Sequence, residues 1–404
     1  MTTNKNHNSP NVPNLRFPEF EGEWEKIKLK DVCTFYSGGT PSSSNKDYYT
    51  GDIPFIRSGE LHESCTELFI SKDGLNNSSA KIVHKGDLLL ALYGATSGDI
   101  AISQIEGAIN QAILCINTEQ SKEYIKAVWQ KHVQKILQTY LQGGQGNLSA
   151  DIVKNISFYF ALSKEQDKLA NFIRLLDERI ATQNKIIEKL QSLIKGLVDS
   201  LLENPSWEKV YLCSFMQFYS TNSLSWEQLS YSNGNVRNMH YGLIHGFQMS
   251  LIDSTLLPRI LPNYLPKQYT VCQDGDVVFA DASEDTNEIG KAIEFSNTIN
   301  VKTVCGLHTI HGRDIKQNTI LGFKGFAFNS RYFHDQVRRL AQGTKVYSIT
   351  AKNLLSCFVY IPDVIKQENI VRRLNAYEEN LSLNRTLLNK YEIQKQYLLQ
   401  QMLI

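Results

Sequence analysis

The sequence predicts an α+β protein with two mixed α/β globular domains separated by two long antiparallel coiled-coil helices, in a pseudo-two-fold arrangement. Three observations lead to this prediction. The chain has 404 residues, enough for two or three domains. It repeats itself once, and each copy ends in a long amphipathic segment. A chain that contains one structural unit twice builds a pseudo-symmetric object.

The repeat is clearest where 165–201 aligns with 366–402 at a constant offset. Upstream the match is weaker but persists, since Trp-Glu-Lys recurs at 24–26 and at 207–209. Residues shared by both copies should build the fold. Residues that differ should carry whatever distinguishes two targets.

The first copy begins with residues 1–20, an Asn-rich stretch that lacks the apolar core of a signal peptide and is predicted to be a disordered tail. The first mixed domain is predicted over 21–163. Its apolar runs Gly86–Tyr93 and Ala108–Ile116 predict buried strands, and Ser121–Leu141 predicts a helix.

The central helix is predicted over 164–204, where apolar residues recur in alternating steps of three and four, and Pro205 ends it. The second globular domain follows over 205–363, and the second long helix over 364–404. Each helix of about 38 residues would measure roughly 57 Å at 1.5 Å per residue.

Each helical seam carries a polar residue near its middle, Gln183 in one and Asn384 in the other. If the helices pair antiparallel, these two side chains face each other, and such a polar layer can fix helix register. The alternative is that the two positions merely tolerate polar residues independently.

The composition limits the function classes. The net charge is only +1, which argues against a strongly basic, stand-alone nucleic-acid binder. The seven cysteines are scattered without a Cys-x-x-Cys pair, which favours reduced thiols in a cytoplasmic protein. His308 and His311 resemble half of a metal site, but no cysteine or carboxylate pair at ligand spacing completes it, so no metal is expected. No apolar run is long enough to span a membrane.

Catalytic motifs are absent from the sequence. None of the ten prolines is adjacent to another, which excludes the Asn/Asp-Pro-Pro-Tyr motif of amino-methyltransferases. The chain has no phosphate-binding P-loop and no dinucleotide fingerprint. The single Pro-Asp, at 362–363, lacks the Glu-x-Lys of a nuclease. The sequence therefore predicts a binding protein rather than an enzyme.

This arrangement resembles the specificity subunit of type I restriction-modification systems, over nearly the whole chain from about Leu15. The most specific stretches are Glu165-Gln166-Asp167-Lys168-Leu169 and Leu176-Asp177-Glu178-Arg179-Ile180, where a globular domain enters its helix, and the opening Pro13–Phe20. The chain departs from the family at Ala161, where proline is common, and at Lys366-Gln367-Glu368, which replaces the fuller Glu-Gln form.

The resemblance implies that each globular domain is a target-recognition domain that reads one half of a bipartite, asymmetric double-stranded DNA site in the major groove. The helices would set the spacer and dock two modification (methyltransferase) subunits and two restriction (ATP-dependent translocase-nuclease) subunits. S-adenosylmethionine, ATP and Mg²⁺ would be bound by those partners, with no cofactor in this chain. The alternative function is a coiled-coil scaffold that carries two modules for ligands other than nucleic acid.

Candidate DNA-binding residues are the loop residues whose side chains suit base edges or phosphates. The alternative for each of them is an ordinary solvated loop residue. In the first domain they are Thr40, Ser42, Ser43, Lys46, Tyr48, Arg57, Tyr93, Thr96, Ser97, Gln145 and Asn147. In the second domain they are Asn222, Arg237, His240, Tyr241, Lys291, Arg313, Arg331, Lys345 and Tyr347.

Overall fold

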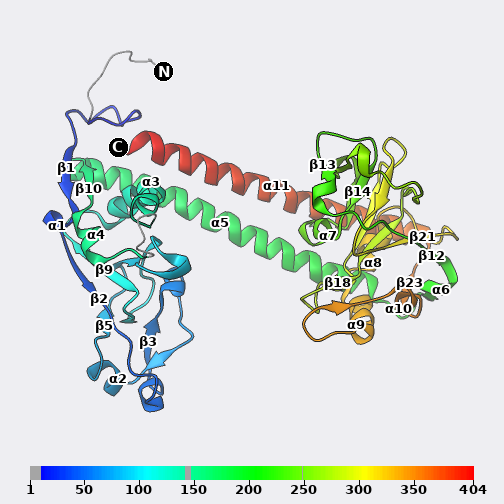
Figure 1. The fold of residues 1–404 in the computed structure, drawn as a ribbon, viewed down its shortest axis with the longest axis horizontal. Helices are drawn as coiled ribbons and strands as arrows, with labels where there is room; N and C mark the ends of the chain where they lie inside the picture. The colour runs from blue at the N-terminus through cyan, green and yellow to red at the C-terminus, as the bar shows by residue number, and fades with distance from the viewer. Residues whose placement is uncertain (1–10, 142–146, 248) are drawn as a thin grey trace. The chain divides into compact units, whose positions relative to one another are not determined.

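The structure is a computed structural model that describes residues 11–141, 147–247 and 249–404 (Figure 1). The chain forms two compact units. The first contains residues 1–184 and 387–404, and the second contains residues 185–386. The boundary between the units falls inside both long helices, α5 (Ser163–Leu202) and α11 (Val364–Met402).

The first unit contains two four-stranded sheets, with strand orders β2-β9-β6-β7 and β4-β3-β8-β5, and the pair β1-β10. Apolar residues of the first sheet pack with α3 and the start of α5 in one core. The strands are β1 (Glu25–Lys28), β2 (Cys33–Ser37), β3 (Ile53–Ile56), β4 (Phe69–Ile70), β5 (Lys81–Val83), β6 (Leu88–Ala91), β7 (Ile100–Ile102), β8 (Gly107–Ile109), β9 (Ile113–Thr118) and β10 (Ser157–Phe160). The helices are α1 (Leu29–Val32), α2 (Lys72–Asn76), α3 (Lys122–Leu141) and α4 (Ala150–Asn155).

The second unit contains a five-stranded sheet in the order β12-β21-β17-β19-β15, a four-stranded sheet in the order β13-β16-β14-β20, and the pairs β11-β23 and β18-β22. Its strands are β11 (Glu208–Tyr211), β12 (Met216–Tyr219), β13 (Leu229–Ser230), β14 (Arg237–Met239), β15 (Leu251–Asp253), β16 (Arg259–Ile260), β17 (Val277–Ala280), β18 (Ala282–Ser283), β19 (Ala292–Ser296), β20 (Thr303–Cys305), β21 (Thr309–Asp314), β22 (Tyr347–Ser348) and β23 (Phe358–Ile361). Its helices are α6 (Leu212–Phe215), α7 (Tyr241–Gly246), α8 (Phe323–Ala327), α9 (Arg331–Leu340) and α10 (Ala351–Leu355).

The two units share the central strand pairings of their sheets, as the sequence repeat predicts. The antiparallel pairings β2·β9, β6·β9 and β6·β7 of the first unit recur as β12·β21, β17·β21 and β17·β19 in the second. The parallel pair β3·β8 recurs as β14·β20, and β1·β10 recurs as β11·β23. The duplication is therefore visible in strand pairing even where the sequences have diverged.

The long helices run antiparallel where they meet inside the first unit. Lys395 of α11 pairs with Asp177 of α5 at 2.5 Å, and Arg179 lies 4.3 Å from the ring centre of Tyr391. Residue numbers thus rise along one helix as they fall along the other. Together with the mixed helices and sheets of both units, the two long helices confirm the predicted α+β class.

The same two helices contribute to the core of the second unit. Val198 and Leu202 of α5 belong to one hydrophobic cluster with Ile370, Val371 and Leu374 of α11. Gln183 is buried, and Asn384 is half-buried, with its Nδ2 donating to the Asn380 carbonyl at 2.8 Å. The proposed pairing of Gln183 with Asn384 stays a prediction.

Each long helix has a buried glutamine in its first turn that connects it by hydrogen bonds to its own unit. Gln166 Nε2 donates to the Ala161 carbonyl at 2.8 Å and to Gln120 Oε1 at 2.9 Å. At the corresponding position, Gln367 Nε2 donates to the carbonyls of Pro362 and Asn318, both at 3.0 Å. Because an amide has two donors, each glutamine can join two segments that would otherwise leave polar atoms unpaired.

Two expectations differ from the structure. The run Ala108–Ile116 is not one strand, because Asn110 Oδ1 accepts the Ala112 amide at 3.1 Å in a turn that divides β8 from β9. The expected disordered tail 1–20 is wrong for its second half, since Arg16 forms a bidentate pair with buried Glu165 at 2.7 Å. Residues 1–10 lie outside the described residues. Among the described helices, none is both long and apolar enough to cross a bilayer.

Candidate nucleic-acid interface

In the first unit, several loops lie together at one end of the sheet β2-β9-β6-β7. Ser37, at the end of β2, pairs with Leu114 at the start of β9, and Ala91, at the end of β6, pairs with Ile113. Antiparallel neighbours place the end of one strand beside the start of the next. The loops 38–44, 92–97 and 110–112 therefore lie side by side at the same end of the sheet. With 147–149, they are called the first loop face.

Polar side chains of the first loop face converge on Gln111. The Thr40 hydroxyl donates to Gln111 Oε1, and the Tyr93 hydroxyl donates to the Gln111 carbonyl at 2.8 Å. Asn147 is exposed, and the next residue, Leu148, donates its amide to the Leu92 carbonyl at 3.0 Å. Ser97 donates to the same carbonyl at 3.0 Å. The structure thus brings Thr40, Tyr93, Ser97 and Asn147 together.

Sequence reasoning missed Gln111, although this exposed amide lies at the centre of the face. Its signal was the polar pair Asn110-Gln111 in the middle of an apolar run, which marks a turn. An amide side chain at a loop tip offers a donor and an acceptor in one plane, the geometry that matches an adenine edge.

Arg57 follows β3 and is already held by carboxylates. Its guanidinium contacts Glu60 at 3.1 Å and Glu67 at 2.6 Å. Hydrogen bonds to these two carboxylates raise the Arg57 pKa above its usual value. Arg57 is therefore half-exposed but ion-paired, unlike a free guanine reader.

The other first-domain candidates spread along the chain after Thr40. Ser42 and Ser43 are exposed, while Thr96 is half-buried in a 3-10 turn, Gly94–Thr96. Lys46 and Tyr48 belong to another 3-10 turn, Lys46–Tyr49, whose Asn45 side chain accepts the Asp47 amide. Gln145 lies outside the described residues.

In the second unit, the corresponding end of the sheet is formed where β12 and β17 end and β21 begins. Its loops 220–224, 281–284, 306–308 and 342–347 are called the second loop face. Asn222 anchors this face, since its amide nitrogen and its Nδ2 both donate to the Cys305 carbonyl, at 3.1 and 3.0 Å. Nδ2 also donates to Asn238 Oδ1 at 2.7 Å. These bonds make Asn222 a structural residue rather than a displayed one.

An aromatic cluster borders the second loop face. The buried His240 ring lies 4.6 Å from the centres of both Trp226 and Tyr241, and Tyr241 meets His308 edge-on at 5.4 Å. Burial lowers the His240 pKa, and the electrostatic interaction with nearby His308 adds to this effect. Trp226 is 44% exposed and Tyr241 36%. The cluster offers a flat apolar surface that the sequence predicted only in part, because neither Trp226 nor His308 is among the candidate DNA-binding residues.

The remaining second-domain candidates do not converge. Arg313 is held by Asp276 at 2.7 Å and lies over Tyr219, near the end of β21 that is remote from the loops. Arg237, at the start of β14, donates to the Leu257 carbonyl. Lys291 is paired with Glu288 at 3.2 Å. Arg331, whose exposed side chain begins α9, lies away from these loops. Among these candidates, only exposed Lys345 and half-buried Tyr347 in β22 belong to the second loop face.

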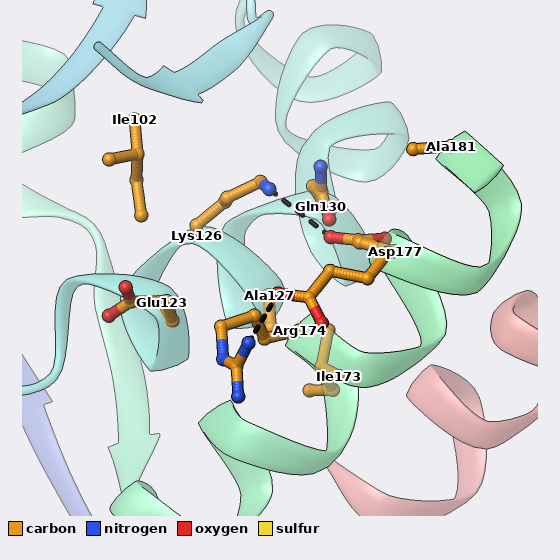
Figure 2. Close-up of a pocket in the computed structure, with 10 residues that line it drawn as sticks. Ile102, Glu123, Lys126, Ala127, Gln130, Ile173, Arg174, Asp177 and Ala181 are labelled. Carbon is orange, nitrogen blue, oxygen red and sulfur yellow. Dashed lines mark hydrogen bonds and ion pairs between the residues drawn. The ribbon is translucent and has the colours of Figure 1, made fainter. Parts of the chain in front are cut away.

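A separate groove lies between α3 and α5 in the first unit, with a volume of about 260 Å³. Figure 2 shows Lys126 reaching across it to Asp177, a contact of 3.3 Å. Arg174 forms an ion pair with Glu178 on its own helix. Its lining residues are Ile102, Glu123, Lys126, Ala127, Gln130, Ile173, Arg174, Asp177, Glu178 and Ala181. Because two ion pairs already occupy four of its charged side chains and it lies between helices, it is not counted in the candidate interface.

The structure also changes the expectation about metal ligands. Cys272, Cys305 and His311 come together in the second unit, with one ligand atom of each within 4.8 Å of the others. The sequence spacing had offered no such partners for His311. His308 instead points to Asp281, with its Nδ1 at 3.3 Å from the carboxylate.

Comparison with known proteins gives one consistent family. Residues 21–192 match the family described as a type I restriction modification DNA specificity domain. The MjaVIII specificity subunit of Methanocaldococcus jannaschii is 22% identical, over 97% of this chain and 93% of the relative. The HindI specificity subunit of Haemophilus influenzae is 29% identical over 31% of this chain and 29% of the relative.

Solved structures show the same fold. The S subunit of a type I restriction-modification system from M. genitalium aligns with a TM-score of 0.60 at 14% identity, over 97% of this chain and 99% of that one. A chain from a study of type I R-M complex assembly and conformational transition aligns with a TM-score of 0.56 at 15% identity, over 93% and 96%.

Proposed function

Since this chain belongs to the family of type I restriction-modification specificity subunits, we propose that it selects the DNA sequence on which such an enzyme acts. One observation carries the mechanism: the loop face is built twice on the same backbone frame with different side chains. The Gly39 amide donates to the Ile109 carbonyl at 3.2 Å, as the Asn222 amide does to Cys305 at 3.1 Å.

Corresponding positions on the two frames differ in chemistry. Arg57 follows β3 where His240 follows β14, and Gln111 corresponds to Leu307. The first loop face therefore presents hydroxyls and an amide, whereas the second presents an aromatic cluster. Because base edges differ in their donors, acceptors and methyl groups, two such faces would select different half-sites. Each unit would read one half of a bipartite, asymmetric site in the major groove.

The chemistry would come from partner subunits. Two modification subunits would bind S-adenosylmethionine and methylate adenine at N6, and two restriction subunits would use ATP and Mg²⁺. The long helices α5 and α11 would dock these partners and set the spacer between half-sites. The complex would act on cytoplasmic DNA.

The lone chain should bind DNA weakly. Its net charge of +1 gives it few counterions to release from the phosphate backbone. The modification subunits would supply the missing phosphate contacts. Equally tight, salt-sensitive binding by the isolated chain would contradict this part of the proposal.

The decisive experiment is to produce the chain with its own modification subunit and to map N6-methyladenine across a methylation-free genome. A split motif with a fixed gap is expected. Gln111→Ala should relax one half of the motif and leave the other half intact, because Gln111 lies on the first loop face. Asn117→Ala, a change of an exposed side chain in β9, the strand that follows Gln111, is the matched control. Loss of specificity in both halves at once, or an unsplit motif, would refute the proposal.

The helices can be tested separately. Inserting one heptad in α5 should lengthen the gap of the mapped motif while both half-sites stay the same. A gap that is unchanged in an active complex would mean that the helices do not set the spacer.

A further inference from the structure

The second unit contains a cluster of two cysteines and a histidine that the DNA-reading function does not use. Cys272 precedes β17, Cys305 ends β20, and His311 is the third residue of β21. Their exposed fractions are 2%, 3% and 0%. The two sulfur atoms lie 3.6 Å apart.

Regular backbone structure holds the three residues in place. The Cys272 amide donates to the Thr303 carbonyl at 2.8 Å, and Cys305 pairs with Met239 in the parallel ladder of β14 and β20. His311 is paired on both sides, with Tyr219 in β12 and with Val278 in β17. The three ligand atoms are therefore brought together by the fold itself.

The hydrogen bonds of His311 leave one ring nitrogen available. Its Nε2 lies 2.7 Å from Asp276 Oδ2, and Arg313 donates to the same carboxylate from Nε at 2.8 Å and from Nη2 at 2.7 Å. A carboxylate held by arginine is ionised and only accepts hydrogen bonds, so Nε2 carries a proton. Among the described residues, nothing forms a hydrogen bond with the buried Nδ1.

We propose that Cys272, Cys305 and His311 bind one zinc ion. In a tetrahedral site with Zn–S bonds of about 2.3 Å, two sulfurs lie about 3.8 Å apart. The observed 3.6 Å matches that edge, while a disulfide would require about 2.05 Å. His311 Nδ1 supplies the third ligand, and Asp276 orients the ring through Nε2, the usual second partner of a zinc-bound histidine.

Charge balance explains how such a group can be buried. On binding Zn²⁺, both thiols release their protons to solvent, and two thiolates with a neutral imidazole cancel the charge of the ion. A neutral site avoids the large cost of isolated charges in an apolar core, and Cys272 and Cys305 lie in such a core.

A cavity of about 250 Å³ lies beside the cluster at Cys305. It is lined by Cys305 together with Thr221, Asn222 and Thr270, among others. Water from this cavity would fill the fourth position. The Cys305 carbonyl accepts both hydrogen bonds from Asn222, so the ion would fasten the strand end that anchors the second loop face.

The first unit provides an internal comparison. There the corresponding positions hold Val83, Ile109 and Cys115, which are buried in an apolar cluster. The correspondence follows from shared bonds: the His84 amide donates to Asp87 Oδ2 at 2.8 Å, as the Gln273 amide does to Asp276 Oδ2 at 2.8 Å. The fold therefore accepts apolar side chains at the two cysteine positions and does not itself demand the cluster.

The test is zinc content of the full chain, purified with reductant and without chelator, then equilibrated with zinc chloride and desalted. One zinc ion per chain is expected by elemental mass spectrometry. The double variant Cys272→Val, Cys305→Ile copies the first unit and should retain at least tenfold less zinc. Cys65→Ser and Cys213→Ser remove exposed cysteines and should leave the content unchanged.

Cobalt provides a second readout that does not depend on the double variant folding. Co²⁺ added to the wild-type chain should give thiolate-to-cobalt charge-transfer bands and the visible absorption of a tetrahedral site, and Cys272→Ser should weaken the charge-transfer bands. Wild-type chain that takes up neither metal would overturn the proposal. So would unchanged zinc in the double variant, or a Cys272–Cys305 disulfide that persists in reductant.

Discussion

Removing the Arg16 side chain should destabilise the first unit far more than an equivalent change in the second. Arg16 forms a bidentate pair with Glu165 at 2.7 Å, and Glu165 is 1% exposed. In Arg16→Ala, Glu165 keeps only the Trp24 indole as a donor, at 3.2 Å, among the bonds described here. Breaking a buried pair from one side costs about 3–5 kcal/mol, because one charge stays buried without its partner.

The partly exposed position of Arg16, whose side chain is 13% exposed, puts the expected cost near the lower limit, at about 3 kcal/mol. A unit of this size should then melt roughly 6–12 °C lower. Differential scanning calorimetry of the full chain measures the shift. Amide hydrogen exchange assigns it, because only amides of the first unit should lose protection.

The repeat supplies the matched control. Lys366 occupies the position of Glu165 in the second copy, but its partner is Asp363, and both side chains are more than half exposed. Lys366→Ala should therefore leave the melting profile unchanged. If Arg16→Ala shifted the melting temperature by less than 2 °C, the Arg16–Glu165 pair would not hold the N-terminal segment to the first unit.

Three further predictions concern stability, pH and recognition. Burial raises the Glu378 pKa to about 7 against the hydrogen bonds from Ser250, so the folded state binds this proton more tightly than the unfolded state does. The contribution of Glu378 to stability should be complete below about pH 4.5 and should fall by ~3 kcal/mol as the pH rises through 7. Glu378→Gln should remove this contribution to the pH dependence in urea titrations, while exposed Glu379→Gln should not. Gln367→Ala removes the partner of two carbonyls and of the Ile320 amide, and it should lower the free energy of unfolding by about 3 kcal/mol, measured by urea titration. Gln166→Ala breaks only two hydrogen bonds and should lower this free energy by less. Equal costs would mean that the third bond contributes nothing. Tyr241→Ala should relax only the half-site read by the second unit in a methylation map, whereas Arg331→Ala, a change of an exposed side chain on α9, should leave the motif intact. If Tyr241→Ala relaxed the same half of the motif as Gln111→Ala, the assignment of one half-site to each unit would be contradicted.

Part of the candidate interface could be predicted because loops can be recognised by their polar composition. Thr40, Tyr93, Ser97 and Asn147 were found this way. Composition does not reveal which polar side chains the fold has already used. The sequence predicts Arg313 as a DNA-binding residue, yet a bidentate bond to Asp276 holds its guanidinium.

The residues that sequence reasoning missed owe their roles to contacts between distant segments. Gln111 was hidden inside an apolar run that turned out to be two strands in different sheets. The metal cluster joins Cys272 to residues more than thirty positions away, so no motif at short spacing could show it.

By itself, the sequence determined the duplicated architecture, the two long helices and the lack of a recognisable catalytic motif, because periodicity and repeats are local or self-comparing patterns. The tertiary structure decided which polar side chains are exposed and which are already bound to other residues of the protein. Strand pairing brings Gln111 to Thr40, Asp276 to Arg313, and two cysteines to His311, and these pairings depend on which strands lie side by side in the folded sheets.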